Sequence, residues 1–148
     1  MVRPDHGGSV RNLQTRIGLS TKKTDYLVAQ LRAHFADCWV LGHERLIASM
    51  DNHPKDRHVL AAAVKCGAQS IVTYNKRDFA AAATEPWGIE VQGPSTFLRY
   101  LYDLDPALVV EKLEEQARDL GRSLPEQLAV LRKAVPAFVD GLCQDLRI

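Results

Sequence analysis

The amino-acid sequence predicts an α/β protein, with a parallel sheet between two layers of helices and a helical extension after it. An almost wholly apolar helix is expected at residues 57–66, and the short β-rich run SIVTY follows at residues 70–74. A helix without a polar face in its middle is buried on most sides. A short, continuous apolar strand is typical of a parallel sheet covered on both faces. Helices and strands also alternate along the first two thirds of the chain, which favours the same three-layer α/β/α class.

The first fifty residues are expected to form four elements. They are a short helix at 10–17, a helix at 24–35, a strand at 38–41 and an amphipathic helix at 44–50. The second helix is predicted because Leu27, Val28 and Leu31 recur at helical spacing, with Ser20 and Thr21 available as N-cap residues.

The central segment contains a turn, the apolar helix, a strand and a second acidic turn at residues 75–78. Pro54 keeps the residue before it extended, and Asp56 can accept hydrogen bonds from the open N–H groups of the first helical turn. Gly67 supplies the left-handed residue that commonly ends a helix. This segment therefore predicts a buried scaffold with an acidic residue at each end.

After this segment, residues 80–87 are expected to form a loop, residues 89–91 a strand and residues 96–102 a helix introduced by Gly93-Pro94-Ser95. Three further helical patterns cover residues 106–120, 124–134 and 136–146, with Gly121 and Pro136 at their joints. We therefore expect an α/β domain over residues 9–102 and a C-terminal helical extension over residues 103–148.

Composition limits the possible functions only broadly. The chain has 148 residues, 46% of them hydrophobic, and a formal net charge of +1. Residues 1–102 carry 13 Lys or Arg against 9 Asp or Glu, which gives +4, and residues 103–148 carry 6 against 9, which gives −3. This mildly basic body allows contact with RNA phosphates but is far from the strongly basic patches of most nucleic-acid binders.

The cysteines and the start of the chain point to the cytoplasm. Cys38, Cys66 and Cys143 are odd in number, widely spaced and set in apolar surroundings, so reduced core thiols are expected. No apolar run approaches the roughly 18–20 residues that cross a bilayer. The segment MVRPDHGGSV has no hydrophobic stretch for secretion. We therefore expect a cytoplasmic protein without a membrane segment.

Polar side chains follow the predicted strand at 70–74. In open α/β sheets ligands bind beyond the carboxyl ends of the strands, where Asn75 and Asp78 are expected. The same two residues also fit a helix cap and a first-turn acid, and Asp56 also fits an N-cap. Whether Asp56 reaches the same crevice depends on how the helix packs, and the sequence leaves this open.

The runs PKDRHVLAAAV at 54–64 and IVTYNKRDF at 71–79 resemble the second half of a PIN domain, the fold of VapC-type toxins and related metal-dependent ribonucleases. The resemblance is close over residues 42–97 and looser over 10–41. It implies Mg²⁺ or Mn²⁺ held for phosphodiester hydrolysis of RNA, and an antitoxin protein as partner. By motif position it implies Asp56 and Asp78 as metal-binding carboxylates, with Asn75 orienting water.

The resemblance gives the basic residues around the two acidic turns a second interpretation. Four side chains could either bind RNA phosphates or simply be solvated surface charges: Lys55, Arg57, Lys76 and Arg77. Only phosphate contact makes binding depend on salt concentration.

The chain departs from the family pattern near its start. A PIN domain begins with a strand bearing a catalytic Asp and a helix bearing a Glu; the strand has no counterpart here, and Gly7, Gly8 and Ser9 stand where the Glu is expected. Two of the four usual acids are then missing, which predicts weak or absent nuclease activity. The alternative is a catalytically inactive interaction module that binds an antitoxin or another partner. Without the first strand, two neighbouring strands would have unpaired edges, which predicts a homodimer, a rearranged sheet or a recruited N-terminal segment.

Overall fold

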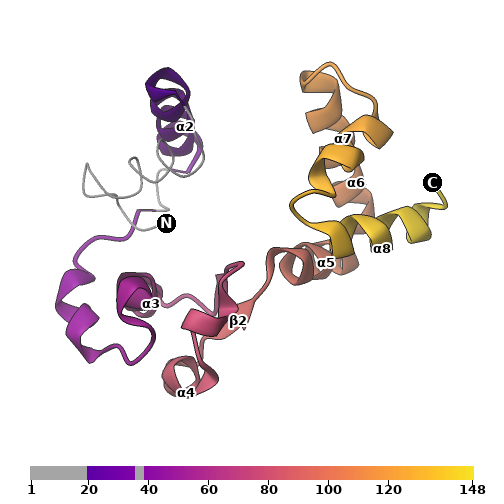
Figure 1. The fold of residues 1–148 in the computed structure, drawn as a ribbon. Coiled ribbons are helices and arrows are strands. Elements are labelled where there is room, and N and C mark those ends of the chain that lie inside the picture. Colours follow the sequence, from indigo (N-terminus) through magenta and orange to yellow (C-terminus); the bar gives the residue numbers. More distant parts are fainter. Residues whose placement is uncertain (1–19, 36–38) are drawn as a thin grey trace. The chain divides into compact units, whose positions relative to one another are not determined.

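A computed structural model gives the structure of the protein and describes residues 20–35 and 39–148 (Figure 1). The helix expected at 10–17 lies outside the described residues. The chain forms two compact units. The first holds the described residues up to Gln69 together with Asp78–Ile89, and the second holds Ser70–Arg77 together with Glu90–Ile148. Each unit is described on its own below.

The first unit begins with helix α2, Thr21–His34, which confirms the helix expected at 24–35. Ser20 is its N-cap residue through its backbone, because the Ser20 carbonyl accepts bonds from the N–H and the hydroxyl of Thr24. Of the strand expected at 38–41, the described residues 39–41 contain a single bridge position, at Val40. The helix expected at 44–50 is present as the 3₁₀ helix η2, Glu44–Ser49.

Helix α3, Arg57–Cys66, has the predicted bounds and follows the 3₁₀ turn η3, Pro54–Asp56. The four consecutive residues from Leu60 to Ala63 are all buried. Because successive residues on an α-helix point about 100° apart, four buried neighbours enclose the middle of the helix on most sides. It packs against η2 and η3 within its unit. Gly67 ends the helix at a φ of 66°, where a side chain would be strained.

Three short helical pieces come later in the chain: η4, Lys76–Asp78; α4, Ala81–Thr84; and η5, Glu85–Trp87. Asp78 and the two later pieces belong to the first unit, whereas Lys76 and Arg77 belong to the second. The loop expected at 80–87 is therefore wrong. Alanine has the highest helix propensity, and the run AAAT forms one helical turn with Ala83 buried.

The sheet of the second unit consists, among the described residues, of strands β1, Ser70–Val72, and β2, Glu90–Gln92. They pair in parallel with Ile71 opposite Val91. This parallel pair in a mostly helical chain is consistent with the α/β class. Both strands have three residues, and β1 is shorter than the predicted five. Cover on both faces is wrong for β1, because Ile71 is buried but Val72 is 41% exposed.

Four helices complete the second unit: α5, Pro94–Leu104; α6, Pro106–Asp119; α7, Leu124–Leu131; and α8, Pro136–Leu146. Each has a proline in its first two positions, where the missing N–H costs no helical hydrogen bond. Helices α6 and α7 are neighbours, and α8 packs against α5 and α7 (Figure 1). Their shared core contains six buried side chains: Tyr102, Leu128, Val135, Phe138, Val139 and Leu142.

One bond ties the segment after β1 to this helical core. The Tyr74 hydroxyl donates to the Ala134 carbonyl at 3.1 Å, just before α8 begins. The strands and the helical extension thus share contacts inside the second unit.

The start of α7 gives a prediction that depends on pH. The N–H and the hydroxyl of Ser123 both donate to Oε2 of Glu126, at 2.8 and 2.7 Å, and these bonds hold the pKa of Glu126 below its ordinary 4.5. A lowered folded-state pKa means that the carboxylate stabilises the fold above the unfolded-state value and ceases to do so as the pH falls through the folded-state value. We expect Glu126→Gln to lower the Tm at neutral pH, with a difference that shrinks below pH 4.5. Thermal melts of the unaltered chain and the variant, followed by circular dichroism at neutral pH and below pH 4.5, check this. A Tm difference that stays the same at the two pH values would contradict it.

The cysteine prediction needs a correction. Cys66, at the end of α3, is exposed, and Cys143 on α8 is only partly buried, so both are free thiols but neither lies enclosed in the core as expected. Cys38 lies outside the described residues. Over residues 20–35 and 39–148, no helix combines the length and the apolar character that a bilayer span requires.

Candidate functional site

The two acidic turns meet inside the first unit. The His53 N–H donates to the backbone carbonyl of Asp78 at 3.1 Å, and the Asp56 N–H donates to the His53 carbonyl at 2.9 Å. One backbone bond therefore joins Asp78 to His53, the residue before the 3₁₀ turn η3, and the other closes that turn at Asp56. The sequence left open whether the Asp56 turn reaches the Asp78 turn, and these contacts bring the two turns together.

Asp78 is a buried acid held by a lysine. Its side chain is 9% exposed, and its Oδ2 lies 2.5 Å from Nζ of Lys55, whose side chain is 56% exposed. A charged group leaves water at a high cost unless an opposite charge or hydrogen bonds replace its hydration. Lys55 is therefore the counter-ion of Asp78 in this structure, a role that differs from the expected contact with RNA phosphate.

Asp56 stands at the N-cap position of α3, but its side chain accepts no capping hydrogen bond. The expected cap role is therefore wrong for this side chain. Its backbone angles, φ −113° and ψ 7°, lie outside the extended region that N-cap residues usually adopt. The side chain is half-buried beside the turn that contacts Asp78.

Asn75, Lys76 and Arg77 belong to the second unit, in the turn that follows β1. The Asn75 N–H donates to Oγ1 of Thr73 at 3.0 Å, and Nε of Arg77 donates to Oδ1 of Asn75 at 3.4 Å. Lys76 and Arg77 are exposed. The first unit thus brings together Asp78, Lys55 and the Asp56 turn.

Asn52 was not expected at the site. Its side chain is 3% exposed, and neither of its amide atoms has a hydrogen-bond partner in the described part of the chain. Its backbone carbonyl accepts a bond from Nε of Arg57 at 3.2 Å. Arg57 is therefore engaged with the turn that precedes α3. No motif in the sequence marks Asn52, and only its burial next to the acidic turn brings it to notice.

Two carboxylates, those of Asp56 and Asp78, are the oxygen donors that the two acidic turns could offer a metal ion. Within the ranges 20–35 and 39–148, no group of three or more His, Cys, Asp or Glu side chains could hold a metal. Mg²⁺ is nevertheless commonly bound by one or two carboxylates, with waters and phosphate oxygens completing its octahedron. Asp78 already binds a cationic group, the Lys55 ammonium. Asp56 and Asp78 therefore suit a largely hydrated divalent ion better than a closed protein cage.

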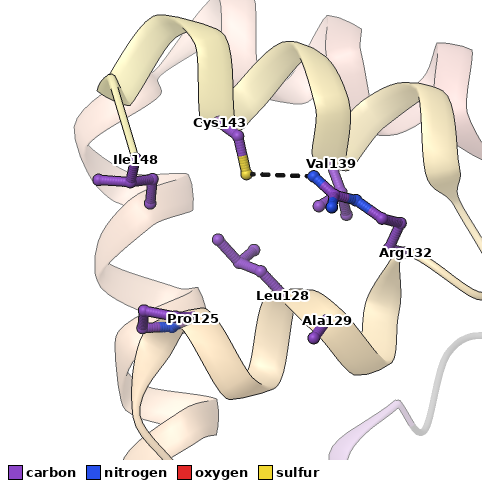
Figure 2. A pocket seen from close by; sticks show the side chains of 7 residues that line it. All are labelled: Pro125, Leu128, Ala129, Arg132, Val139, Cys143 and Ile148. Atoms are coloured by element: carbon purple, nitrogen blue, oxygen red, sulfur yellow. Dashed lines mark hydrogen bonds between the residues drawn. The ribbon is translucent and has the colours of Figure 1, made fainter.

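The helices of the second unit enclose a separate pocket of about 230 Å³ between α7 and α8 (Figure 2). Nη2 of Arg132 lies 3.7 Å from Sγ of Cys143 there, and Nε of Arg132 lies 2.9 Å from Oδ1 of Asp140. The lining is mainly apolar and consists of Pro125, Leu128, Ala129, Arg132, Val139, Cys143 and Ile148. It contains no carboxylate, so it offers no oxygen ligands for a hard cation.

Comparison with known proteins finds a bacterial ribonuclease. The chain is 47% identical over 66 residues to a protein of Mycobacterium tuberculosis (strain ATCC 25618 / H37Rv) named "Putative ribonuclease VapC50". The match covers 45% of this chain and 39% of that relative, so it spans well under half of the relative's length. No protein-family model matches the chain, and no solved structure matches it. Over nearly half its length, the chain is thus similar to a VapC-type ribonuclease.

Proposed function

We propose that this chain is a VapC-type endoribonuclease with a PIN-like three-layer fold, whose acids Asp56 and Asp78 bind Mg²⁺ or Mn²⁺. The observation that carries the proposal is the buried Asp78 carboxylate, which pairs with the Lys55 ammonium and lies beside the turn that contains Asp56. The likeness to a VapC-type ribonuclease supports RNA as the substrate and a small antitoxin protein as a partner.

The two carboxylates would fix the ion, and the bound ion would lower the pKa of an attacking water and neutralise charge on the scissile phosphate. Asp78 is suited to hold the ion in place because its burial leaves the carboxylate little freedom to move. Asp56 would supply a second oxygen from the start of α3. With at most these two carboxylates, much of the ion's shell would be water and phosphate, and we expect weak cleavage.

Other side chains would orient the RNA and the water. The exposed Lys76 and Arg77 would contact RNA phosphates, and Arg57 would do so from the first turn of α3. Asn75 would orient the water through its amide, and its bond from Arg77 would restrict the amide's rotation. Binding of RNA should then weaken as salt is raised.

The experiment is RNA cleavage by the whole chain with Mg²⁺ or Mn²⁺, before and after removal of the metal by a chelator. We expect Asp56→Asn and Asp78→Asn each to reduce cleavage about 100-fold or more, because loss of even an indirect metal partner can cost that much. Asp51→Asn is the matched control, since Asp51 is an exposed turn residue of the same unit and should leave cleavage unchanged. Metal-dependent cleavage that survives both site variants would contradict the assignment.

A second candidate is a catalytically inactive module that binds an antitoxin or another protein. It is favoured by apolar side chains that lie open on α5 and at the start of α6: Tyr100, Leu101, Leu104 and Leu108, exposed by 39–82%. Open apolar groups gathered on one stretch commonly mark a protein interface. In the same experiment, no metal-dependent cleavage by the unaltered chain, together with a stoichiometric complex with an antitoxin, would favour this candidate.

A further inference from the structure

Lys55 places a positive charge where the proposed site would bind its metal ion. Its Nζ lies 2.5 Å from Oδ2 of Asp78, and the Asp78 side chain is 9% exposed. Mg²⁺ binds carboxylate oxygens at about 2.0–2.1 Å. An ammonium group and a divalent ion bound to the same carboxylate at these distances would compete for it, because their like charges would repel each other.

We propose that Lys55 is a tethered competitor of the metal ion, an inference that rests on the proposed function. Without metal, the Lys55 ammonium neutralises the buried carboxylate of Asp78. When Mg²⁺ or Mn²⁺ arrives, the Nζ–Oδ2 ion pair breaks, a metal–oxygen bond forms, and the ammonium moves into water with its three protons. One cation replaces another, so the buried Asp78 carboxylate has a counter-charge both before and after the exchange.

The unequal exposure of the two partners favours this exchange. Lys55 is 56% exposed and carries its charge on a flexible four-carbon stem, so its ammonium can regain water by rotation alone. Asp78 cannot follow it, because its backbone carbonyl is bonded to His53 and its side chain is enclosed. The carboxylate therefore stays in place while the lysine leaves.

Competition lowers the apparent affinity for metal. The ion binds only the fraction of molecules whose carboxylate is free of Lys55, so the apparent Kd is the intrinsic Kd divided by that fraction. The lysine thus sets the metal concentration at which the site fills. Removing its charge should tighten metal binding, whereas removing a lysine that assists metal binding would weaken it.

The test measures Mn²⁺ binding to the whole chain by the loss of the free-ion electron paramagnetic resonance signal. We expect Lys55→Gln to bind Mn²⁺ about tenfold more tightly than the unaltered chain, and Asp78→Asn to lose binding. Lys55→Arg keeps the positive charge and should stay close to the unaltered affinity. Lys112→Gln is the matched control, because it removes one lysine that is ion-paired with Glu115 in the second unit.

The outcomes separate this inference from the function on which it rests. Unchanged or weaker Mn²⁺ binding in Lys55→Gln, with binding still lost in Asp78→Asn, would overturn the competition and leave the metal site standing. No Mn²⁺ binding in either the unaltered chain or Lys55→Gln would overturn both. Tighter binding in Lys112→Gln as well would assign the gain to net charge and overturn the competition.

A second experiment follows the Lys55 ammonium directly in the unaltered chain, where its charge is kept. The lysine ammonium signals of the unaltered chain can be followed by nitrogen-15 NMR, with the Lys55 signal identified by its absence in Lys55→Arg. We expect this signal to move to the position of a solvated lysine as Mg²⁺ is added. A signal that stays at its ion-paired position while Mg²⁺ binds would overturn the proposed exchange.

Discussion

Replacing Phe138 with alanine is expected to lower the free energy of unfolding by about 3–5 kcal/mol, because the substitution removes buried apolar surface and leaves a cavity. Phe138 is 3% exposed on α8 and belongs to the core shared by the helices of the second unit. Val139 and Leu142, its neighbours in that core, are almost fully buried and anchored on the same helix. They are therefore poorly placed to collapse into the space, which puts the cost toward the upper end of the range.

The measurement is urea unfolding followed by circular dichroism, with the same substitution at Phe35 as control. Phe35 is 59% exposed at the end of α2, so Phe35→Ala should change the free energy of unfolding by less than about 0.5 kcal/mol. A similar loss in both variants would contradict the core described for the second unit. Loss of the unfolding transition in Phe138→Ala alone would place its cost above the expected range.

Elements with strong local end signals were predicted to the residue. Helices α3 and α8 have the expected bounds. A proline turn precedes α3 and Gly67 follows it, and Pro136 opens α8, so local residues mark both ends of α3 and the start of α8. The parallel pairing of β1 with β2 was also expected, because it follows from the alternation of helix and strand.

Elements without such signals were predicted less well. The run AAAT has no cap residue on either side, and a loop was expected where α4 forms one turn. The segment 44–50 has helical periodicity, but hydrophobic spacing does not separate a 3₁₀ from an α-helix over so few residues. The strand β1 was expected to be longer and covered on both faces, because the exposure of Val72 depends on which elements pack on the sheet.

In the candidate site, too, features marked by the local sequence could be predicted, and contacts that depend on the fold could not. Asp56 and Asp78 stand out in the sequence because each lies at an end of the apolar helix–strand segment. The ion pair between Lys55 and Asp78 could not be predicted, since the two residues are 23 positions apart and meet only through the fold. A buried aspartate is expected to pair with a positively charged residue. Four basic residues flank the two turns, however, and the sequence does not indicate which of them pairs with Asp78.

Leu60→Ala is expected to lower the free energy of unfolding by about 2–5 kcal/mol. Leu60 is fully buried in the middle of α3, with Ala61 and Ala62 beside it almost equally enclosed. Small neighbours offer no long side chain that could fill the space, so the cavity should persist. The matched control is Leu104→Ala on α5, where the side chain is 82% exposed and the expected change is within about 0.5 kcal/mol. Urea unfolding of the two variants provides the comparison.

The same variant should also weaken the proposed metal site, although Leu60 carries no ligand. Helix α3 starts directly after Asp56, and its first turns support the segment whose backbone bonds reach Asp78. A cavity one turn into the helix gives that segment room to move, and metal ligands bind well only when their geometry is fixed beforehand. We therefore expect Leu60→Ala, under conditions where circular dichroism shows it folded, to bind Mn²⁺ more weakly than Leu104→Ala does. Equal Mn²⁺ affinity in the two variants would mean that the η3 turn keeps its position without support from α3.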